Sequence, residues 1–120
     1  MITNLDNIAD MVHQNAVEKG FHDPEETELA FMANQCNNIH AEVTELWDAY
    51  RAGIEGDFCD KAVKMIELNL QPLTQKEEEL ADIIIRALDV SRHLRIDIVG
   101  AINAKHAYNK TRPHKHGKKN

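Results

Sequence analysis

The stretch that decides the fold runs from residue 23 to residue 53 and reads DPEETELAFMANQCNNIHAEVTELWDAYRAG. Its apolar residues recur in alternating steps of three and four, the spacing that lines up one face of an α-helix. This first apolar seam consists of Leu29, Met32, Cys36, Ile39, Val43, Leu46 and Tyr50. We predict one long helix, with Asp23 as its N-cap, Pro24 in its first turn and Gly53 as its stop.

Three other stretches predict helices of their own. Residues 4–19 carry apolar side chains at helical spacing and end before Gly20. Residues 74–77 read TQKE, a capping box, and the helix behind it carries a second apolar seam of Leu80, Ile83, Ala87, Val90 and Leu94. Asp97 caps a last helix that runs to about Asn109, and Pro113 disfavours its continuation. We expect residues 54–73 to form an inserted loop or a short helix. With the four helices above, the sequence predicts an all-α bundle of four main helices.

Composition narrows the class of protein. The chain has 120 residues, the size of one domain, so residues 1–120 are interpreted as a single domain. No apolar run approaches the roughly 20 residues of a membrane span, and the polar N-terminus does not resemble a signal peptide. Two cysteines are too few for a disulfide framework, which favours a reducing, cytoplasmic location.

Charge is unevenly distributed along the chain. Residues 105–120 hold five Lys, one Arg and no acid, a local charge of +6, while the whole chain carries −6. The first 104 residues therefore carry −12. An acidic body of this kind repels nucleic acid, so we expect no nucleic-acid partner.

Two pairs of acids have matching positions beside the two apolar seams. Glu42 and Glu45 are spaced i, i+3 and each precedes a residue of the first seam; Glu79 and Asp82 relate to the second seam in the same way. If the two helices pack antiparallel, all four carboxylates converge at the edge of the seams. Such a cluster is stabilised by a cation, and oxygen ligands alone suit Mg²⁺ or Mn²⁺. The alternative is that these acids are solvated helix flanks.

Polar residues extend both acidic stripes. Gln35 and Asn38 continue the first stripe, where their amides either read the edge of a base or sugar or are ordinary surface residues. Arg86 continues the second, where it balances the acids, contacts a phosphate or forms a plain salt bridge. Glu77 and Glu78 are accounted for by the dipole at the helix N-terminus.

The basic end of the chain is a candidate phosphate-binding element. Lys105, Asn109 and Arg112 share one face if the last helix holds, and Lys and Arg suit phosphate oxygens as a point charge and a planar fork. The alternative is a solvated tail. For residues 113–120, the basic tail, we favour the interpretation as a solvated tail.

Together these motifs resemble the MazG-like nucleotide pyrophosphohydrolases of the all-α NTP pyrophosphatase superfamily, whose signature is EExxE, a spacer and ExxD. Residues 41–45 read AEVTE and match the first half in its second and third acids, while residues 79–82 read ELAD. Residues 105–113 read KHAYNKTRP and are similar to the ending of many small members. Two features depart from the family: Ala41 replaces its first Glu, and the spacer of 33 residues is longer than usual.

The resemblance implies hydrolysis of a nucleoside or deoxynucleoside triphosphate to the monophosphate and pyrophosphate. By position, Glu42, Glu45, Glu79 and Asp82 would bind Mg²⁺. Cations and polar groups of the basic end would bind the phosphates of the substrate; these residues are Lys105, Tyr108, Asn109 and Arg112. Family members form homodimers or homotetramers, which would also explain why the helix around residues 83–88 is apolar on most sides. The rival hypothesis is a non-catalytic helical adaptor that uses its basic C-terminus to bind a partner.

Overall fold

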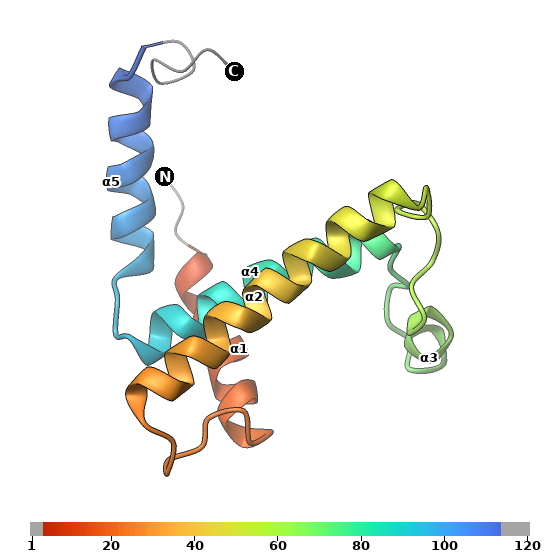
Figure 1. The fold of residues 1–120 in the computed structure, drawn as a ribbon, viewed down its shortest axis with the longest axis horizontal. Coiled ribbons are helices and arrows are strands. Elements are labelled where there is room, and N and C mark those ends of the chain that lie inside the picture. The colour runs from red at the N-terminus through yellow and green to blue at the C-terminus, as the bar shows by residue number, and fades with distance from the viewer. Residues whose placement is uncertain (1–3, 114–120) are drawn as a thin grey trace. The chain divides into compact units, whose positions relative to one another are not determined.

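The computed structural model describes residues 4–113, and within them the chain forms five helices and no strand (Figure 1). The prediction of an all-α protein is confirmed. Apart from Pro113, the basic tail lies outside the described residues. The helices are α1 (Leu5–Glu18), α2 (Glu28–Arg51), α3 (Ala62–Glu67), α4 (Gln75–His93) and α5 (Ile98–Thr111). No helix within residues 4–113 is both long enough and apolar enough to cross a membrane.

The chain folds into two compact units. The terminal unit contains α1, the end of α4 from Leu88 onward, and α5. The central unit spans Gly20–Ala87 and contains α2, α3 and the first part of α4. All the acids of the two predicted pairs belong to the central unit.

In the terminal unit, charged side chains tie α1 to the end of α4. The guanidinium of Arg92 donates hydrogen bonds of 2.6 Å to a carboxylate oxygen of Asp6 and of 2.6 Å to one of Asp10. His13 Nδ1 lies 2.8 Å from Asp89 Oδ1. At the start of α5, Asp97 accepts a hydrogen bond of 3.0 Å from the backbone N–H of Gly100, so its predicted role as an N-cap is confirmed.

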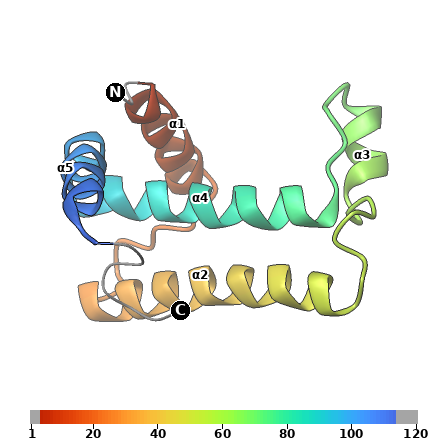
Figure 2. The same cartoon turned by 90° about the horizontal axis from the view of Figure 1, so that it is seen from above.

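In the central unit, α2 and the first part of α4 run side by side in opposite directions (Figures 1 and 2). The buried residues of α2 are Phe31, Gln35, Glu42 and Ala49. The first apolar seam is only partly buried in the single chain, since Leu29, for example, is 83% exposed. The difference is about one position around the helix: the buried line includes the polar residues Gln35 and Glu42 beside Phe31 and Ala49, and much of the apolar seam faces outward from the single chain.

The long helix also starts later than predicted. Thr27 is the N-cap of α2, and its hydroxyl accepts a hydrogen bond of 3.1 Å from the N–H of Ala30. Asp23 instead holds the preceding turn, in which its carboxylate accepts a hydrogen bond of 2.9 Å from the N–H of Glu25. Both residue types cap helices well, and here the one closer to the first apolar residue does so. The predicted stop is confirmed: Gly53, directly after the C-cap Ala52, has a φ of +73°, a conformation in which glycine is favoured.

Residues 54–73 form a loop whose two ends are joined and which carries a short helix. The N–H of Cys59 donates a hydrogen bond of 2.9 Å to the carbonyl of Leu73, and the N–H of Gln75 donates one of 2.8 Å to the carbonyl of Asp57. Between them lies α3, which confirms the short-helix alternative. The closed base brings this segment to the N-terminus of α4.

Candidate metal-binding site

The predicted capping box orients the start of α4. The carboxylate of Glu77 accepts hydrogen bonds of 3.0 Å from the backbone N–H of Thr74 and 2.8 Å from its hydroxyl, and the N–H of Glu77 lies 3.4 Å from that hydroxyl. These bonds lower the pKa of Glu77. The next two acids, Glu78 and Glu79, are buried.

Three of the four predicted carboxylates lie together. One oxygen from each of Glu42, Glu45 and Glu79 lies within 4.8 Å of the others. Glu42 and Glu79 are buried, whereas Glu45 is exposed. The first two acids come from the middle of α2 and the third from the first turns of the antiparallel α4, as the matched spacing of the two pairs predicted.

These carboxylates form part of the wall of a cavity of about 510 Å³ in the central unit. The fourth predicted acid, Asp82, lines the same cavity one turn further along α4. The lining residues are Glu42, Glu45, Asp60, Lys61, Gln75, Glu78, Glu79 and Asp82.

Sequence reasoning missed four of these lining residues. Asp60 and Lys61 precede α3, and no spacing links them to the acids of α2 and α4, so only the fold brings them to the cavity. Gln75 is the first residue of α4. Glu78 could have been found, because it lies next to Glu79, but the helix dipole was a sufficient explanation for an acid in a first turn.

The electrostatics of the cavity show how crowded the carboxylates are. Burial, hydrogen bonding to Glu42 and Glu45, and the negative charge of those two groups raise the pKa of Glu79 to about 8. Burial and the charges of Glu42 and Glu78 raise the pKa of Asp82. Without a metal ion, Glu79 and Asp82 therefore hold their protons more tightly than ordinary carboxyl groups do.

Two cations offset part of this negative charge. Arg86 Nε donates a hydrogen bond of 3.2 Å to Glu42 Oε1, so of the three predicted roles of Arg86 the structure shows a salt bridge that also balances the acids. Lys61 Nζ donates one of 3.1 Å to Glu78 Oε2. This bond raises the pKa of Lys61 above its usual value. Neither cation bonds directly to Glu45 or Glu79 among the interactions of the described chain.

The remaining predicted residues lie elsewhere. Gln35 is buried on α2 and Asn38 is exposed there, and neither lines the cavity within the described chain. The other four lie on α5 in the terminal unit, where Lys105 Nζ is 4.9 Å from the ring centre of Tyr108 and the Arg112 guanidinium is 5.7 Å from it. Lys105 and Asn109 line a shallow depression of about 310 Å³ on that helix. A role for these α5 residues at the acidic site stays a prediction.

The residues of the cavity fit a metal ion. All the candidate ligands are carboxylate oxygens, the donors that hard divalent cations prefer. The buried oxygen Glu79 Oε2 has no hydrogen-bond partner among the residues that the structure describes. A buried carboxylate oxygen without a donor is costly, and a bound cation would satisfy it.

Comparison with known proteins identifies no relative of the chain. No protein-family model matches the chain, and no curated protein or solved structure is significantly similar to it. The resemblance to MazG-like enzymes therefore stays a prediction, and function has to be inferred from the geometry of the cavity.

Proposed function

We propose that the protein is a Mg²⁺-dependent hydrolase that cleaves a nucleoside or deoxynucleoside triphosphate to the monophosphate and pyrophosphate. The observation that carries the proposal is the convergence of Glu42, Glu45 and Glu79 on one cavity that Asp82 also lines. The motifs AEVTE and ELAD, which supply these four acids, support the same reaction through their resemblance to MazG-like enzymes.

In this proposal the four carboxylates hold Mg²⁺, or Mn²⁺ in its place. The bound ion supplies Lewis-acid chemistry, by polarising phosphate oxygens and lowering the pKa of a bound water. Arg86 holds Glu42 in position through its hydrogen bond of 3.2 Å. Lys105 and Arg112, with Tyr108 and Asn109 beside them, neutralise the phosphate chain, either in their own subunit or in a neighbouring one.

The reaction replaces one bond to phosphorus by another. The oxygen of a water molecule bonds to the α-phosphorus, and the bond from that phosphorus to the oxygen bridging to the β-phosphorus breaks. Pyrophosphate leaves with the bridging oxygen. The proton lost by the water passes to a carboxylate of the site or to solvent. The products are the nucleoside monophosphate and pyrophosphate, and control of a nucleotide pool is the corresponding cellular role.

Exposed apolar side chains support the further proposal of a homodimer or homotetramer. Val43, Trp47 and Tyr50 on α2 and Leu80 and Ile84 on α4 are each about half exposed or more in the single chain. Large exposed apolar surface on a soluble protein marks an interaction site. A second copy of the chain would cover it and complete the helical bundle.

The decisive experiment is to incubate the protein with a panel of NTPs and dNTPs, with Mg²⁺ or with excess chelator, and to separate the products by anion exchange. We expect monophosphate and pyrophosphate, formed only with the metal. Run in water labelled with heavy oxygen, attack at the α-phosphorus places the label in the monophosphate, whereas attack at the β-phosphorus places it in pyrophosphate. Diphosphate and phosphate as products would contradict the proposal, and absence of turnover on every nucleotide would favour the helical adaptor.

A further inference from the structure

The wall of the acidic cavity contains a lysine that the segment 54–73 holds in place. Lys61 directly precedes α3, and two residues of the same turn, Cys59 and Ala62, are buried. The N–H of Ala62 donates a hydrogen bond of 3.1 Å to the carbonyl of Cys59, and Cys59 is bonded in turn to Leu73 at the base of the loop. The backbone of Lys61 is therefore fixed, while its side chain remains 63% exposed.

Lys61 is the positively charged residue among the described residues that line the cavity. Six of the eight are carboxylates and one is an amide, so the lysine carries the positive charge of the wall. Its ammonium lies 3.1 Å from Glu78 Oε2 and 3.5 Å from Asp60 Oδ1. An ammonium has three N–H donors, so it can exchange or add an acceptor without leaving the wall.

A second observation supports a charged ligand in the cavity. The buried oxygen Glu79 Oε2 has no donor among the described residues, which indicates that a cation belongs there. A metal ion in that position would bring a polyphosphate with it, and the surrounding carboxylates would repel the phosphate oxygens. Lys61 is the lining group with the charge to receive them.

We propose that Lys61 binds a phosphate oxygen of the metal-bound substrate, exchanging its contact with Glu78 for one with the phosphate chain. The inference rests on the proposed function and adds to it a residue that the inserted segment contributes. Lys61 is then a substrate-binding residue, and the segment 54–73 takes part in recognising the triphosphate.

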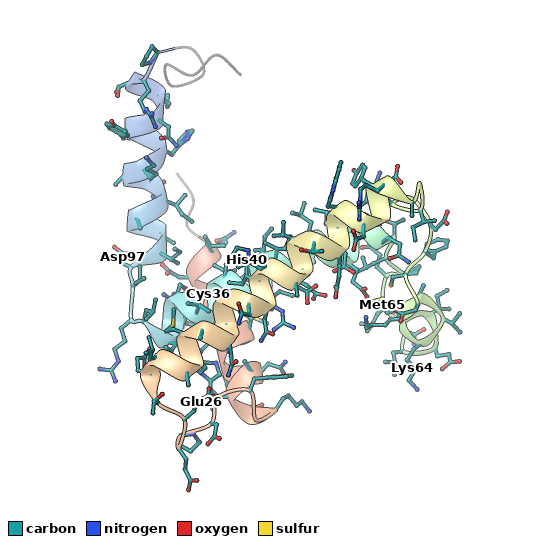
Figure 3. The ribbon with its side chains drawn as sticks, in the orientation of Figure 1. Glu26, Cys36, His40, Lys64, Met65 and Asp97 are labelled. Carbon is teal, nitrogen blue, oxygen red and sulfur yellow. The ribbon has the colours of Figure 1, made fainter. Side chains whose placement is uncertain are left out.

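Binding can be measured without turnover. In calorimetric titrations with inorganic pyrophosphate in the presence of Mg²⁺, we expect Lys61→Met to weaken binding by about tenfold, the scale of a charge-assisted contact. Lys61→Arg should recover part of the affinity. The matched control is Lys64→Met: Lys64 lies on α3 (Figure 3), is similarly exposed, pairs with Glu67 at 3.7 Å and is absent from the described lining of the cavity. A parallel titration with nucleoside monophosphate distinguishes contact with the β- and γ-phosphates, which only pyrophosphate reports, from contact with the α-phosphate.

A purely structural role for the Lys61–Glu78 pair predicts a different pattern. If the pair only holds the loop, Lys61→Met and Glu78→Gln should weaken pyrophosphate binding equally. If Lys61 binds phosphate, Glu78→Gln releases the ammonium and removes a repelling charge, so pyrophosphate should bind at least as tightly as to the wild type. Circular dichroism establishes that each variant keeps its helices.

The outcomes separate this inference from the proposed function. If the wild type hydrolyses nucleotides but Lys61→Met binds pyrophosphate and substrate with unchanged affinity and KM, the role of Lys61 is refuted and the hydrolase proposal stands. If the wild type hydrolyses no nucleotide, the titrations still decide whether Lys61 binds phosphate. Failure of the wild type to bind pyrophosphate with Mg²⁺ would overturn the role of Lys61, whereas the products of the nucleotide panel decide the hydrolase proposal.

Discussion

Arg86 Nε on α4 lies 3.2 Å from Glu42 Oε1 on α2. Helix α4 therefore supplies a cation to an acid of α2, in addition to the cavity acids Glu79 and Asp82. The pair is partly buried, with the Glu42 side chain 11% exposed. Removing one partner of such a pair leaves the other charge poorly compensated. Arg86 thus holds the two helices together while the carboxylates repel one another.

Substitution of Arg86 should make the protein depend more strongly on the metal. In Arg86→Met we expect the metal-free protein to unfold at a lower temperature than the wild type. Mg²⁺ should then raise the unfolding temperature by more than it does in the wild type, because the ion takes over the charge compensation. Thermal unfolding followed by circular dichroism, with and without Mg²⁺, measures both effects.

The control for this variant is Arg51→Met. Arg51 pairs with Asp48 on the same helix at 2.6 Å, and both side chains are well exposed. Exposed pairs contribute little to stability, so this variant should respond to Mg²⁺ as the wild type does. An equal response of the two variants would show that Arg86 has no special relation to the acidic cluster.

Neutral isosteres of the acids should abolish turnover without unfolding the chain. Glu42→Gln and Asp82→Asn keep the shape of the side chain and remove the charge that holds the metal, so we expect a loss of activity of more than about 100-fold, since even indirect partners of a metal commonly cost 10- to 100-fold. Product analysis with the best nucleotide of the panel gives the activity, and far-UV circular dichroism reports the fold. Asp48→Asn, also on α2 but outside the described lining of the cavity, is the matched control. If both cavity variants retain wild-type activity, the four carboxylates do not form the site.

The helices could largely be predicted from the sequence, because their ends are coded locally. Gly53, the capping box at Thr74 and the cap at Asp97 each act on neighbouring backbone groups, and the structure has helix ends at all three. The prediction that Asp23 caps this helix was wrong, because Thr27, another good capping residue, lies four residues further on and caps it instead. Capping preferences alone do not decide which of two nearby capping residues starts the helix.

Which face of a helix is buried was harder to predict. The seven-residue repeat of α2 identified an apolar line, but the single chain buries Gln35 and Glu42 beside that line while Val43 stays half exposed. A repeat indicates that a surface is apolar without saying what covers it. The same limit explains why Lys61 was missed: its place at the cavity depends on the closure of residues 54–73, a contact that no spacing encodes.

The metal-free protein should lose stability as the pH rises. The pKa of Glu79 is raised to about 8 in the folded protein, above its ordinary value of 4.5, so the folded state holds this proton more tightly than the unfolded state. The resulting stabilisation is complete below pH 4.5 and is lost as the pH rises through 8. The raised pKa of Asp82 acts in the same direction. We expect the unfolding temperature of the chelator-treated protein to fall between pH 5 and pH 8.5.

Two comparisons test whether Glu79 causes this dependence. Glu79→Gln should flatten the pH profile of the metal-free protein, whereas Glu67→Gln on the exposed side of α3 should not. Mg²⁺ should restore stability at high pH, because the ion replaces the proton as the charge that the cluster requires. A wild-type profile that stays level, or one that Glu79→Gln leaves unchanged, would exclude Glu79 as the titrating group.

A charge placed on the apolar surface of α4 should dissociate the proposed oligomer. Ile84 is half exposed in the single chain and carries no polar group, so in an assembled protein Ile84→Glu would bury an unpaired carboxylate. We expect light scattering to give the mass of a dimer or tetramer for the wild type and of a monomer for the variant. Trp47, also well exposed in the single chain, should then emit at longer wavelength as water reaches it. The control is Lys64→Glu on α3, which makes an even larger charge change without removing apolar surface and should leave the mass unchanged. A wild type that is monomeric at micromolar concentration would rule out assembly through this face.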